Sequence, residues 1–547
     1  MKRKKELIVI LSSLLVIVLS VSVAYFTTKI LGTGKEISVE SADLKVIFTS
    51  GSGTINGSNI EPGWSSGENT FTVKNESNGT YSYNIIIKDL VNTFVTEGFL
   101  QYKITSTDGG YNMTDFEDVP KSSTKADTTL AENISIEKGA THTYKIVINY
   151  INSDDVNQSA DMGKKLSGKI FIEKYKTPTL ASKLLRDNPT ISTRSDFSTP
   201  FTTNTANTLY KITEDGTDVY YFAGQDTEST PVHNWVKIGT YVTDGPIWGY
   251  YSETEQGYKE YTSMEECTSA TKYNINCSYA WKAGDSIYWR IIRTNSDGSI
   301  RVLYSGTNPG TTNGYIGQSE FNASSNSPKY VGYMYGDSDT TLEEARTNTN
   351  DSTIKTYIDN WYENNLTTYT NYLSNDAIYC NDRELRSGKS YSVSSMFQFK
   401  AYERLGLKKV PSYDCTNSKD AFSVNNTEAK LKYPIALMTV DEIAYAGGVI
   451  YENAPMWYYT NSTYSAITGE ESWWTLSSGY GGGSTQTMWY VFSSADRSGI
   501  NFDGGRSLVE NGATNVRPVT SLKSCVLWKS GDGSADNPYE IVENGGC

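Results

Sequence analysis

Short runs of alternating apolar and polar residues, separated by turn residues, restrict what the first third of this chain can fold into. In residues 141–151, every second residue from Tyr144 to Tyr150 is apolar, whereas Lys145 and Asn149 between them are polar. Similar runs lie at residues 44–50, 70–75, 81–88, 99–106 and 166–175. Period-two alternation in short segments predicts half-buried strands, and we therefore expect an all-β sandwich over residues 36–176.

The chain opens with a basic, apolar leader. Lys2, Arg3, Lys4 and Lys5 precede a stretch from Leu7 to Phe26 that carries no charge. Such a stretch is long enough to cross a bilayer, and basic residues before it direct the rest of the chain outward. We interpret residues 1–35 as a signal peptide or membrane anchor and the remainder as extracytoplasmic.

A small-x-small sequence, Ser22-Val23-Ala24, lies near the end of the leader and is typical of a signal-peptidase site. We expect cleavage after Ala24. If the leader is not cut, the stretch from Leu7 to Phe26 is a single transmembrane helix that anchors the protein to the membrane.

The charge of the chain disfavours nucleic acid as a partner. Lys and Arg total 48 against 62 Asp and Glu, which gives a formal net charge of −14. An acidic surface repels a phosphate backbone. The 41 Tyr and 11 Trp suit a recognition surface, although Tyr is also a good strand residue in any β-rich protein.

Six cysteines in an exported chain favour disulfides over metal ligation, since no Cys-x-x-Cys pair occurs. Six cysteines allow fifteen pairings. Closing short loops costs the least entropy, so we expect neighbours in sequence to pair. The expected disulfides are Cys267–Cys277, Cys380–Cys415 and Cys525–Cys547.

A Thr-, Ser-, Asn- and Pro-rich segment at residues 177–207 predicts an interdomain linker, with one short helical piece at 180–187. Residues 208–547 then form the second domain. Helices are predicted there at 352–366, 396–405 and 440–446, the last with Thr439 and Glu442 as a capping box.

Strands surround and follow these helices. A hairpin is predicted at residues 287–305, around the turn Asn295-Ser296-Asp297-Gly298. Further strands are predicted at 457–459, 472–477, 488–493, 500–502 and 516–523. Helices followed by a strand meander indicate an α+β domain with an antiparallel sheet.

The leader ends in Ala24-Tyr25-Phe26-Thr27, and a predicted Ser-, Thr- and Asn-rich sandwich follows it. This combination resembles the camelysin and biofilm-matrix-fibre proteins of Gram-positive-type bacteria, over roughly the first 175 residues. The resemblance implies an exported β-sandwich. It also raises an alternative function, a structural subunit of an extracellular fibre or matrix.

Six segments of the second domain follow one another in a specific order. They are 354–361, Tyr379-Cys380-Asn381-Asp382-Arg383, Tyr433-Pro434-Ile435, 439–448, Trp473-Trp474-Thr475-Leu476-Ser477 and Val516-Arg517-Pro518-Val519. This set resembles an exported bacterial domain of uncharacterised function, related in fold to C-type lectins and to formylglycine-generating enzymes. The resemblance implies a C-type-lectin-like α+β domain with insertions, and it favours the pairing of Cys380 with Cys415.

No catalytic constellation stands out. His142 and His233 fall in different predicted domains, so neither predicts a triad or a zinc site. Formylglycine-generating enzymes depend on a reactive cysteine pair near the C-terminal sheet, and residues 457–523 contain no cysteine. We therefore expect no enzyme, and an enzyme of that fold is the least favoured alternative.

No metal or cofactor is expected either. The calcium-binding loop and strand motifs of C-type lectins are absent from the sequence. Asp337 with Asp339, and Asp532 with Asp536, lack the spacing of a regular calcium loop, and we interpret them as solvated turn residues.

Ligand-binding candidates lie on the last strands and on the loops that join them. Loops on a rigid sheet are where recognition residues gather, and one of two adjacent strand tryptophans points away from the core. The candidates are Trp474, Tyr490, Asp496, Arg497, Asp503 and Arg506. Arg383 and Arg517 are interpreted as structural, Arg517 by holding a loop through a carboxylate.

The sequence thus predicts a multidomain bacterial protein, an all-β sandwich followed by an α+β C-type-lectin-like domain. We expect it to be secreted or at the cell surface and to act in recognition or adhesion. Its expected partner is an extracellular ligand, a glycan or a protein, whose identity the sequence leaves open.

Overall fold

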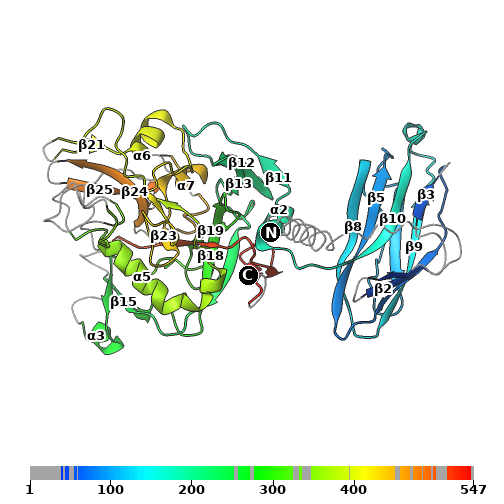
Figure 1. The fold of residues 1–547 in the computed structure, drawn as a ribbon, viewed down its shortest axis with the longest axis horizontal. Coiled ribbons are helices and arrows are strands. Elements are labelled where there is room, and N and C mark those ends of the chain that lie inside the picture. The colour runs from blue at the N-terminus through cyan, green and yellow to red at the C-terminus, as the bar shows by residue number, and fades with distance from the viewer. Residues whose placement is uncertain are drawn as a thin grey trace, which may run out of the picture. The chain divides into compact units, whose positions relative to one another are not determined.

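The computed structural model describes residues 38–40, 44–48, 54–57, 60–251, 257–270, 276–323, 332–334, 347–392, 395–449, 456–468, 472–482, 485–494, 497–499, 514–543 and 547. The leader and its expected cut after Ala24 lie outside these residues. The protein is mostly β-sheet with few helices (Figure 1). It divides into two compact units, Met1–Lys176 (the first unit) and Thr177–Cys547 (the second unit). No helix in the described ranges has both the length and the apolar character needed to cross a bilayer.

The first unit is a sandwich of two antiparallel sheets. One sheet has the order β1 (Ser38–Glu40), β2 (Leu44–Phe48), β4 (Asn69–Asn75), β9 (Thr141–Tyr150), β6 (Leu100–Ser106) and β7 (Glu117–Asp118). The other has the order β3 (Thr54–Gly57), β10 (Leu166–Lys174), β5 (Tyr81–Asn92) and β8 (Ser122–Ile136). The six runs predicted as strands are strands, with ends within a few residues of those expected.

The core of the first unit lies between the two sheets. Along β9, buried residues alternate with exposed ones, so the apolar face from Tyr144 to Tyr150 meets residues such as Ile85 and Ile170 of the other sheet. His142 is also buried on this face, with its Nδ1 2.8 Å from the hydroxyl of Tyr83. Burial lowers the pKa of His142, because a charged imidazole is poorly solvated there.

The sequence did not reveal β8, the longest strand of the sandwich. Its sequence is rich in Ser, Thr and charged residues, and most of its side chains are exposed. It is an edge strand that pairs only with β5 among the described strands. Its pairing with β5 shifts register repeatedly. Bulges and charged residues of this kind protect an edge from unwanted pairing, and they also erase the alternation that identifies a strand.

The second unit is built around a ten-stranded sheet in its described residues. Its main path is β11 (Thr190–Ser192), β12 (Thr208–Glu214), β13 (Thr217–Tyr221), β18 (Ser286–Thr294), β14 (Trp235–Thr240), β29 (Tyr539–Ile541) and β28 (Trp528–Ser530). A branch from β18 adds β19 (Ile300–Tyr304), β27 (Pro518–Leu522) and β23 (Ile435–Leu437). The predicted hairpin of β18 and β19 is confirmed.

Smaller sheets surround the large one. Figure 1 shows β15 (Ile247–Tyr251) and α3 (Met264–Ser269) at one end of the second unit, where β16 (Gly257–Tyr261) and β17 (Cys277–Tyr279) complete a small sheet. A two-stranded ladder joins β20 (Tyr379–Cys380) to β22 (Ala421–Phe422). A four-stranded sheet has the order β21 (Phe397–Gln398), β24 (Trp473–Gly482), β25 (Thr485–Ser494) and β26 (Arg497–Gly499).

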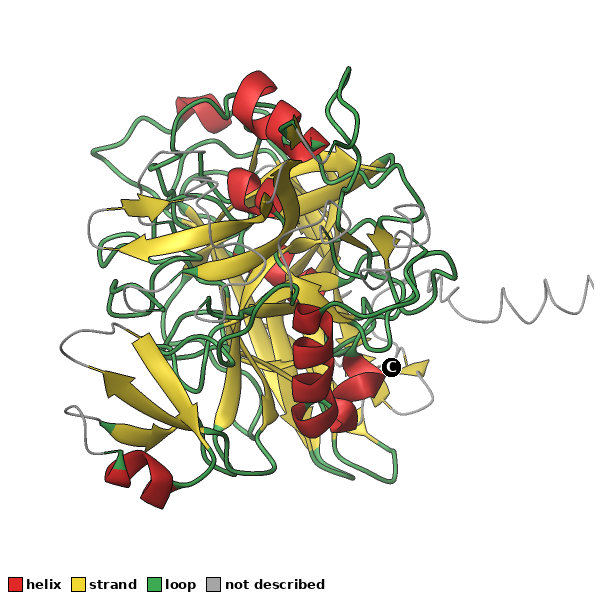
Figure 2. Ribbon diagram, turned by 90° about the vertical axis from the view of Figure 1, so that its left-hand side faces the viewer, coloured by secondary structure: helices red, strands yellow, loops and turns green. Residues whose placement is uncertain are grey.

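The longest helix of the second unit, α5 (Thr353–Asn365), packs on the large sheet, as Figure 2 shows. Ser352 caps it by accepting a hydrogen bond from the backbone of Lys355 at 3.2 Å. Its buried Trp361 meets the rings of Trp289 and Tyr304 edge on. The helix predicted at 352–366 is confirmed.

The composition of residues 177–207 predicted an interdomain linker. In the structure, these residues are part of the second unit. The helix α2 (Leu180–Asp187) forms where it was predicted, and Leu180 and Leu184 are fully buried in the core of that unit. Farther on, Arg194 donates to the carbonyl of Tyr445 at 2.5 Å. Two buried leucines stabilise the docked segment more than its Thr- and Pro-rich composition suggests.

Two further predictions are wrong. Residues 457–459 form a buried turn and no strand, where Trp457 donates its ring N–H to the carbonyl of Phe222. The helix predicted at 396–405 begins only at Lys400 as α6 (Lys400–Tyr402), because Phe397 pairs with β24. It then continues as the π-helical turn Glu403–Lys408.

All three expected disulfides are present, Cys267–Cys277, Cys380–Cys415 and Cys525–Cys547. All six cysteines lie in the second unit. Disulfides indicate an oxidising, extracytoplasmic environment for the folded chain.

Candidate functional site

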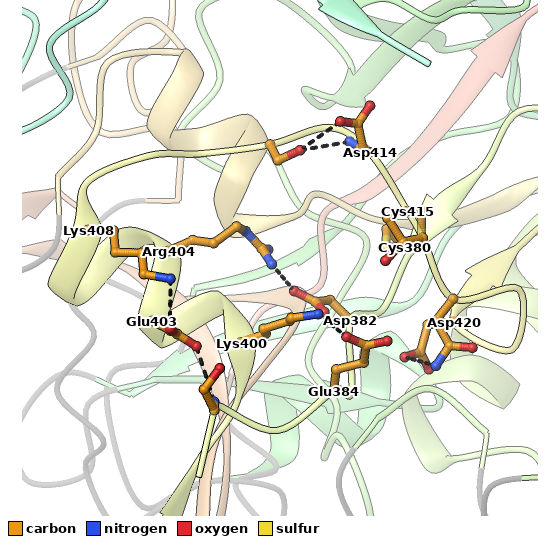
Figure 3. Close-up of a pocket in the computed structure, with 14 residues that line it drawn as sticks. Cys380, Asp382, Glu384, Lys400, Glu403, Arg404, Lys408, Asp414, Cys415 and Asp420 are labelled. Carbon is orange, nitrogen blue, oxygen red and sulfur yellow. Dashed lines mark hydrogen bonds and ion pairs between the residues drawn. A yellow bond between two sulfur atoms is a disulfide. The ribbon is translucent and has the colours of Figure 1, made fainter. Parts of the chain in front are cut away.

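A polar cavity of about 260 Å³ lies in the second unit, where three segments of the chain meet (Figure 3). The segments are the residues after β20, the helical stretch from Lys400 to Lys408, and the loop that leads to β22. We call it the charged cavity, and its lining is Cys380, Asp382, Glu384, Ser387, Lys400, Glu403, Arg404, Lys408, Ser412, Asp414, Cys415, Thr416, Asn417 and Asp420. Every one of these side chains is polar or part of a disulfide.

One wall is held in place by a disulfide and a buried ion pair. Cys380 at the end of β20 is bonded to Cys415 in the facing loop. Arg383 Nε donates to Asp420 Oδ1 at 2.7 Å, with both side chains about 1% exposed. The interpretation of Arg383 as a structural residue agrees with this contact, because it ties the strand segment to the loop.

The opposite wall is helical. Glu403 and Arg404 lie three and four residues after Lys400, and Lys408 lies four residues after Arg404, which brings these side chains to one side of the helical stretch. Lys408 pairs with Glu403 at 2.7 Å, and Lys400 pairs with Glu384 across the cavity. The stretch ends at Lys409, whose φ of 54° is left-handed.

Arg404 crosses to the middle of the cavity, as Figure 3 shows. Its Nη1 lies 2.5 Å from Asp382 Oδ2 and its Nη2 lies 2.6 Å from Asp441 Oδ2. Burial raises the pKa of Asp382 to about 6; Arg404 opposes this shift and the charge of Asp441 adds to it.

Behind the charged cavity is a pocket of about 20 Å³, the back pocket, which shares five lining residues with it, among them Asp382 and Arg404. Two buried arginines form its far side. Arg293 Nη1 lies 2.9 Å from Glu214 Oε1, and Arg301 Nη1 lies 3.2 Å from Glu442 Oε1. Glu442 also accepts a hydrogen bond from the backbone of Thr439, which completes the predicted capping box of α7 (Val440–Tyr445).

The side chains that line the charged cavity can form hydrogen bonds and ion pairs with a ligand. Its lining contains no histidine, and its two cysteines are joined to each other. Throughout the described ranges, no three His, Cys, Asp or Glu side chains are grouped as metal ligands. Burial raises the pKa of the Asp382 carboxyl to about 6, so the protonation of this lining residue changes in the mildly acidic range.

Of the ligand-binding residues expected from the sequence, Trp474 can be placed in full, and it does not line the charged cavity. Trp474 is fully buried and donates its ring N–H to the carbonyl of Ser319 at 2.8 Å, so it belongs to the core and not to a ligand groove. Tyr490 lies on β25 and Arg497 on β26. Asp496, Asp503 and Arg506 lie outside the described residues.

The structure also describes Arg517 and Asp532, for which the sequence predicted structural roles. Arg517 is buried and holds loops, as expected, but its partners in the part of the chain that the structure describes include no carboxylate. It donates to Tyr304 O at 3.0 Å and to Tyr458 O at 2.7 Å. Asp532 accepts from the backbone of Ser534 in a turn. Asp337 and Asp339 lie outside the described residues.

Sequence reasoning singled out one segment of the cavity wall, Tyr379-Cys380-Asn381-Asp382-Arg383, without predicting the cavity. A further signal was available in the charged side chains at helical spacing from Lys400 to Lys408. No known family model matches the chain, and no curated protein matches its sequence.

Proposed function

We propose that this protein is a bacterial recognition or adhesion protein, secreted or at the cell surface, and that its second unit binds a small polar ligand in the charged cavity. The observation that carries the proposal is the cavity itself: about 260 Å³, lined by polar side chains from three segments that a disulfide and ion pairs hold in place. Concave sites with convergent polar groups are where proteins bind small ligands.

In this proposal, the sandwich of the first unit is a stalk and the second unit is a C-type-lectin-like α+β head. The sequence resemblances to camelysin-type proteins and to the exported lectin-related domain support these two roles. In this proposal the second unit acts by binding and not by catalysis.

Ligand panels test the proposal. The full chain is screened against glycan, peptide and small-metabolite collections, and hits are measured by calorimetry. Thr416 lines the cavity and is exposed, so Thr416→Trp should block the mouth and abolish binding. Thr124→Trp changes an exposed threonine of the first unit and serves as the matched control. Absence of any binding, or equal binding by both variants, contradicts the proposal.

A second candidate function is a subunit of an extracellular fibre or matrix. Its support is β8, a strand of 15 residues at a sheet edge that pairs only with β5 in the described part of the sandwich. Exposed edges are templates for pairing with another chain. Filaments of the full chain that grow with concentration, seen by electron microscopy, favour this function; a monomer at all concentrations excludes it.

A further inference from the structure

Carboxylates outnumber cations around the charged cavity. Including Asp441 and Arg383, which pair with lining residues, the site holds six carboxylates and four cations. Three of the cations form ion pairs, Lys400–Glu384, Lys408–Glu403 and Arg383–Asp420, and Lys400 also interacts with the charge of Asp382. These three pairs cancel in charge, so the excess must come from the groups that remain.

The first excess charge lies at Arg404. This one guanidinium serves both Asp382 and Asp441, whose side chains are only 13% and 6% exposed. Two carboxylates and one cation leave one negative charge, and low exposure keeps solvent from screening it.

The second excess charge is Asp414, on the rim. Its carboxylate accepts hydrogen bonds from the backbone N–H of Asp215 at 3.0 Å and from the hydroxyl of Ser412 at 3.4 Å. No basic side chain pairs with Asp414 in the described ranges. Another carboxylate, Asp215, is nearby: its pKa is raised by burial and by the charges of Asp414 and Glu214.

We propose that the charged cavity binds its ligand through a cationic nitrogen, a primary ammonium group such as that of a lysine side chain, which interacts with Asp382 and Asp414. This inference rests on the proposed function. An ammonium group supplies three donors and the missing positive charge, whereas an anion meets the same excess as repulsion. A metal ion is the poorer fit, because the described carboxylates are not grouped as metal ligands.

The protonation of Asp382 adds a pH dependence. Burial raises its pKa to about 6, and of the charged groups that face it, Arg404 lowers the pKa whereas Asp441 and Asp420 raise it. A bound ammonium group favours the charged carboxylate. Ammonium binding should therefore weaken as the pH falls through about 6.

A matched pair of probes tests the inference. Nα-acetyl-lysine methylamide carries one ammonium group, and its Nε-acetylated counterpart has the same backbone and no charge. Titrated into the full chain at pH 7.5, the charged probe should bind about tenfold more tightly, a difference of about 1.4 kcal/mol. The ratio of the two affinities should fall from about tenfold to about threefold in Asp414→Asn, which loses an exposed charge. In Asp382→Asn the two probes should bind almost equally.

Both variants are expected to fold. Asn tolerates the left-handed backbone that Asp382 adopts at a φ of 50°, and Asp414 is exposed. Asp244→Asn, an exposed carboxylate of the same unit paired with Lys282, is the control and should change neither affinity. Thermal melting of each variant checks folding.

The outcomes separate this inference from the proposed function. Equal affinity for the two probes, or binding of glucose, inorganic phosphate or calcium ions that Thr416→Trp blocks while the ammonium probe does not bind, overturns the cationic ligand and leaves the recognition site standing. Failure of every probe and panel member to bind overturns both.

Discussion

Five buried arginines mark the second unit among the described residues, and their partners differ in kind. Four face carboxylates, in the pairs Arg290–Asp226, Arg293–Glu214, Arg301–Glu442 and Arg383–Asp420. Among the described residues, the hydrogen-bond partners of Arg517 are carbonyl and hydroxyl oxygens. Burial together with the charge of Arg290 lowers the pKa of Arg517 to about 9. The sequence predicted that Arg517 is structural. It also predicted a carboxylate as the partner of Arg517, because a buried charge usually has a counter-charge.

Replacing Arg517 tests this network. In Arg517→Met the buried carbonyls of Tyr304 and Tyr458 lose donors that water cannot replace. The free energy of unfolding should fall by about 3 kcal/mol in urea denaturation. Lys389→Ala, at an exposed position, should stay within about 0.5 kcal/mol of the wild type. Equal effects of the two substitutions would show that Arg517 is not a structural crosslink.

The raised pKa of Asp382 should make the stability of the protein depend on pH. Its folded pKa of about 6 lies above the ordinary value of 3.8, so between these values the folded chain binds the proton more tightly than the unfolded chain. Stability contributed by this group is therefore lost as the pH rises from about 4 to about 6. The free energy of unfolding of the wild type minus that of Asp382→Asn should decrease as the pH rises from about 4 to about 6. Denaturation series of both proteins at matched pH measure this difference. A constant difference would contradict the raised pKa.

Elements with a strong local signal could be predicted from the sequence. Ser352 begins α5, and Thr439 with Glu442 begins α7, because caps satisfy backbone donors within a single turn. β8 was missed because its Ser-, Thr- and charge-rich sequence and its repeated register shifts erase the alternation of buried and exposed residues. The turn at 457–459 was mistaken for a strand because its aromatic residues are buried. The cavity was not predictable, because a disulfide and ion pairs assemble it from segments that carry no common sequence motif.

Two cap substitutions should separate local from tertiary stabilisation. Ser352→Ala removes one capping hydrogen bond and should lower the free energy of unfolding by about 1 kcal/mol. Glu442→Ala removes a cap and leaves Arg293 and Arg301 without a shared buried carboxylate, so it should cost about 3–5 kcal/mol. Both values come from urea denaturation. Similar losses in the two variants would mean that the ion pairs of Glu442 contribute little.

At the scale of the whole molecule, the two units are stabilised differently. The first unit contains no cysteine and depends on the apolar core between its sheets, whereas all three disulfides lie in the second unit. Compact units with separate cores unfold in separate transitions. The alternation of apolar and polar residues made most strands of the first unit predictable from the sequence. Much of the second unit depends on contacts between segments far apart in the chain, which leave no such pattern.

Reduction should therefore act on one unit only. With dithiothreitol, the calorimetric transition of the second unit should move to lower temperature, since each disulfide contributes about 2–4 kcal/mol. The transition of the first unit should stay in place. The Cys380→Ser, Cys415→Ser double variant should reproduce part of the shift without reductant. A shift of both transitions would show that the units are coupled.

The pairing of β14 with β29 sets an order of events during synthesis and export. Val236 lies beside Tyr539 in the same sheet, and Cys525 forms its disulfide with Cys547. The first unit can be completed while the rest of the chain is still being made. In the second unit, β14 has no partner in β29 and Cys525 has no partner in Cys547 until the C-terminal residues have been made, whereas the other two disulfides join cysteines that are present earlier.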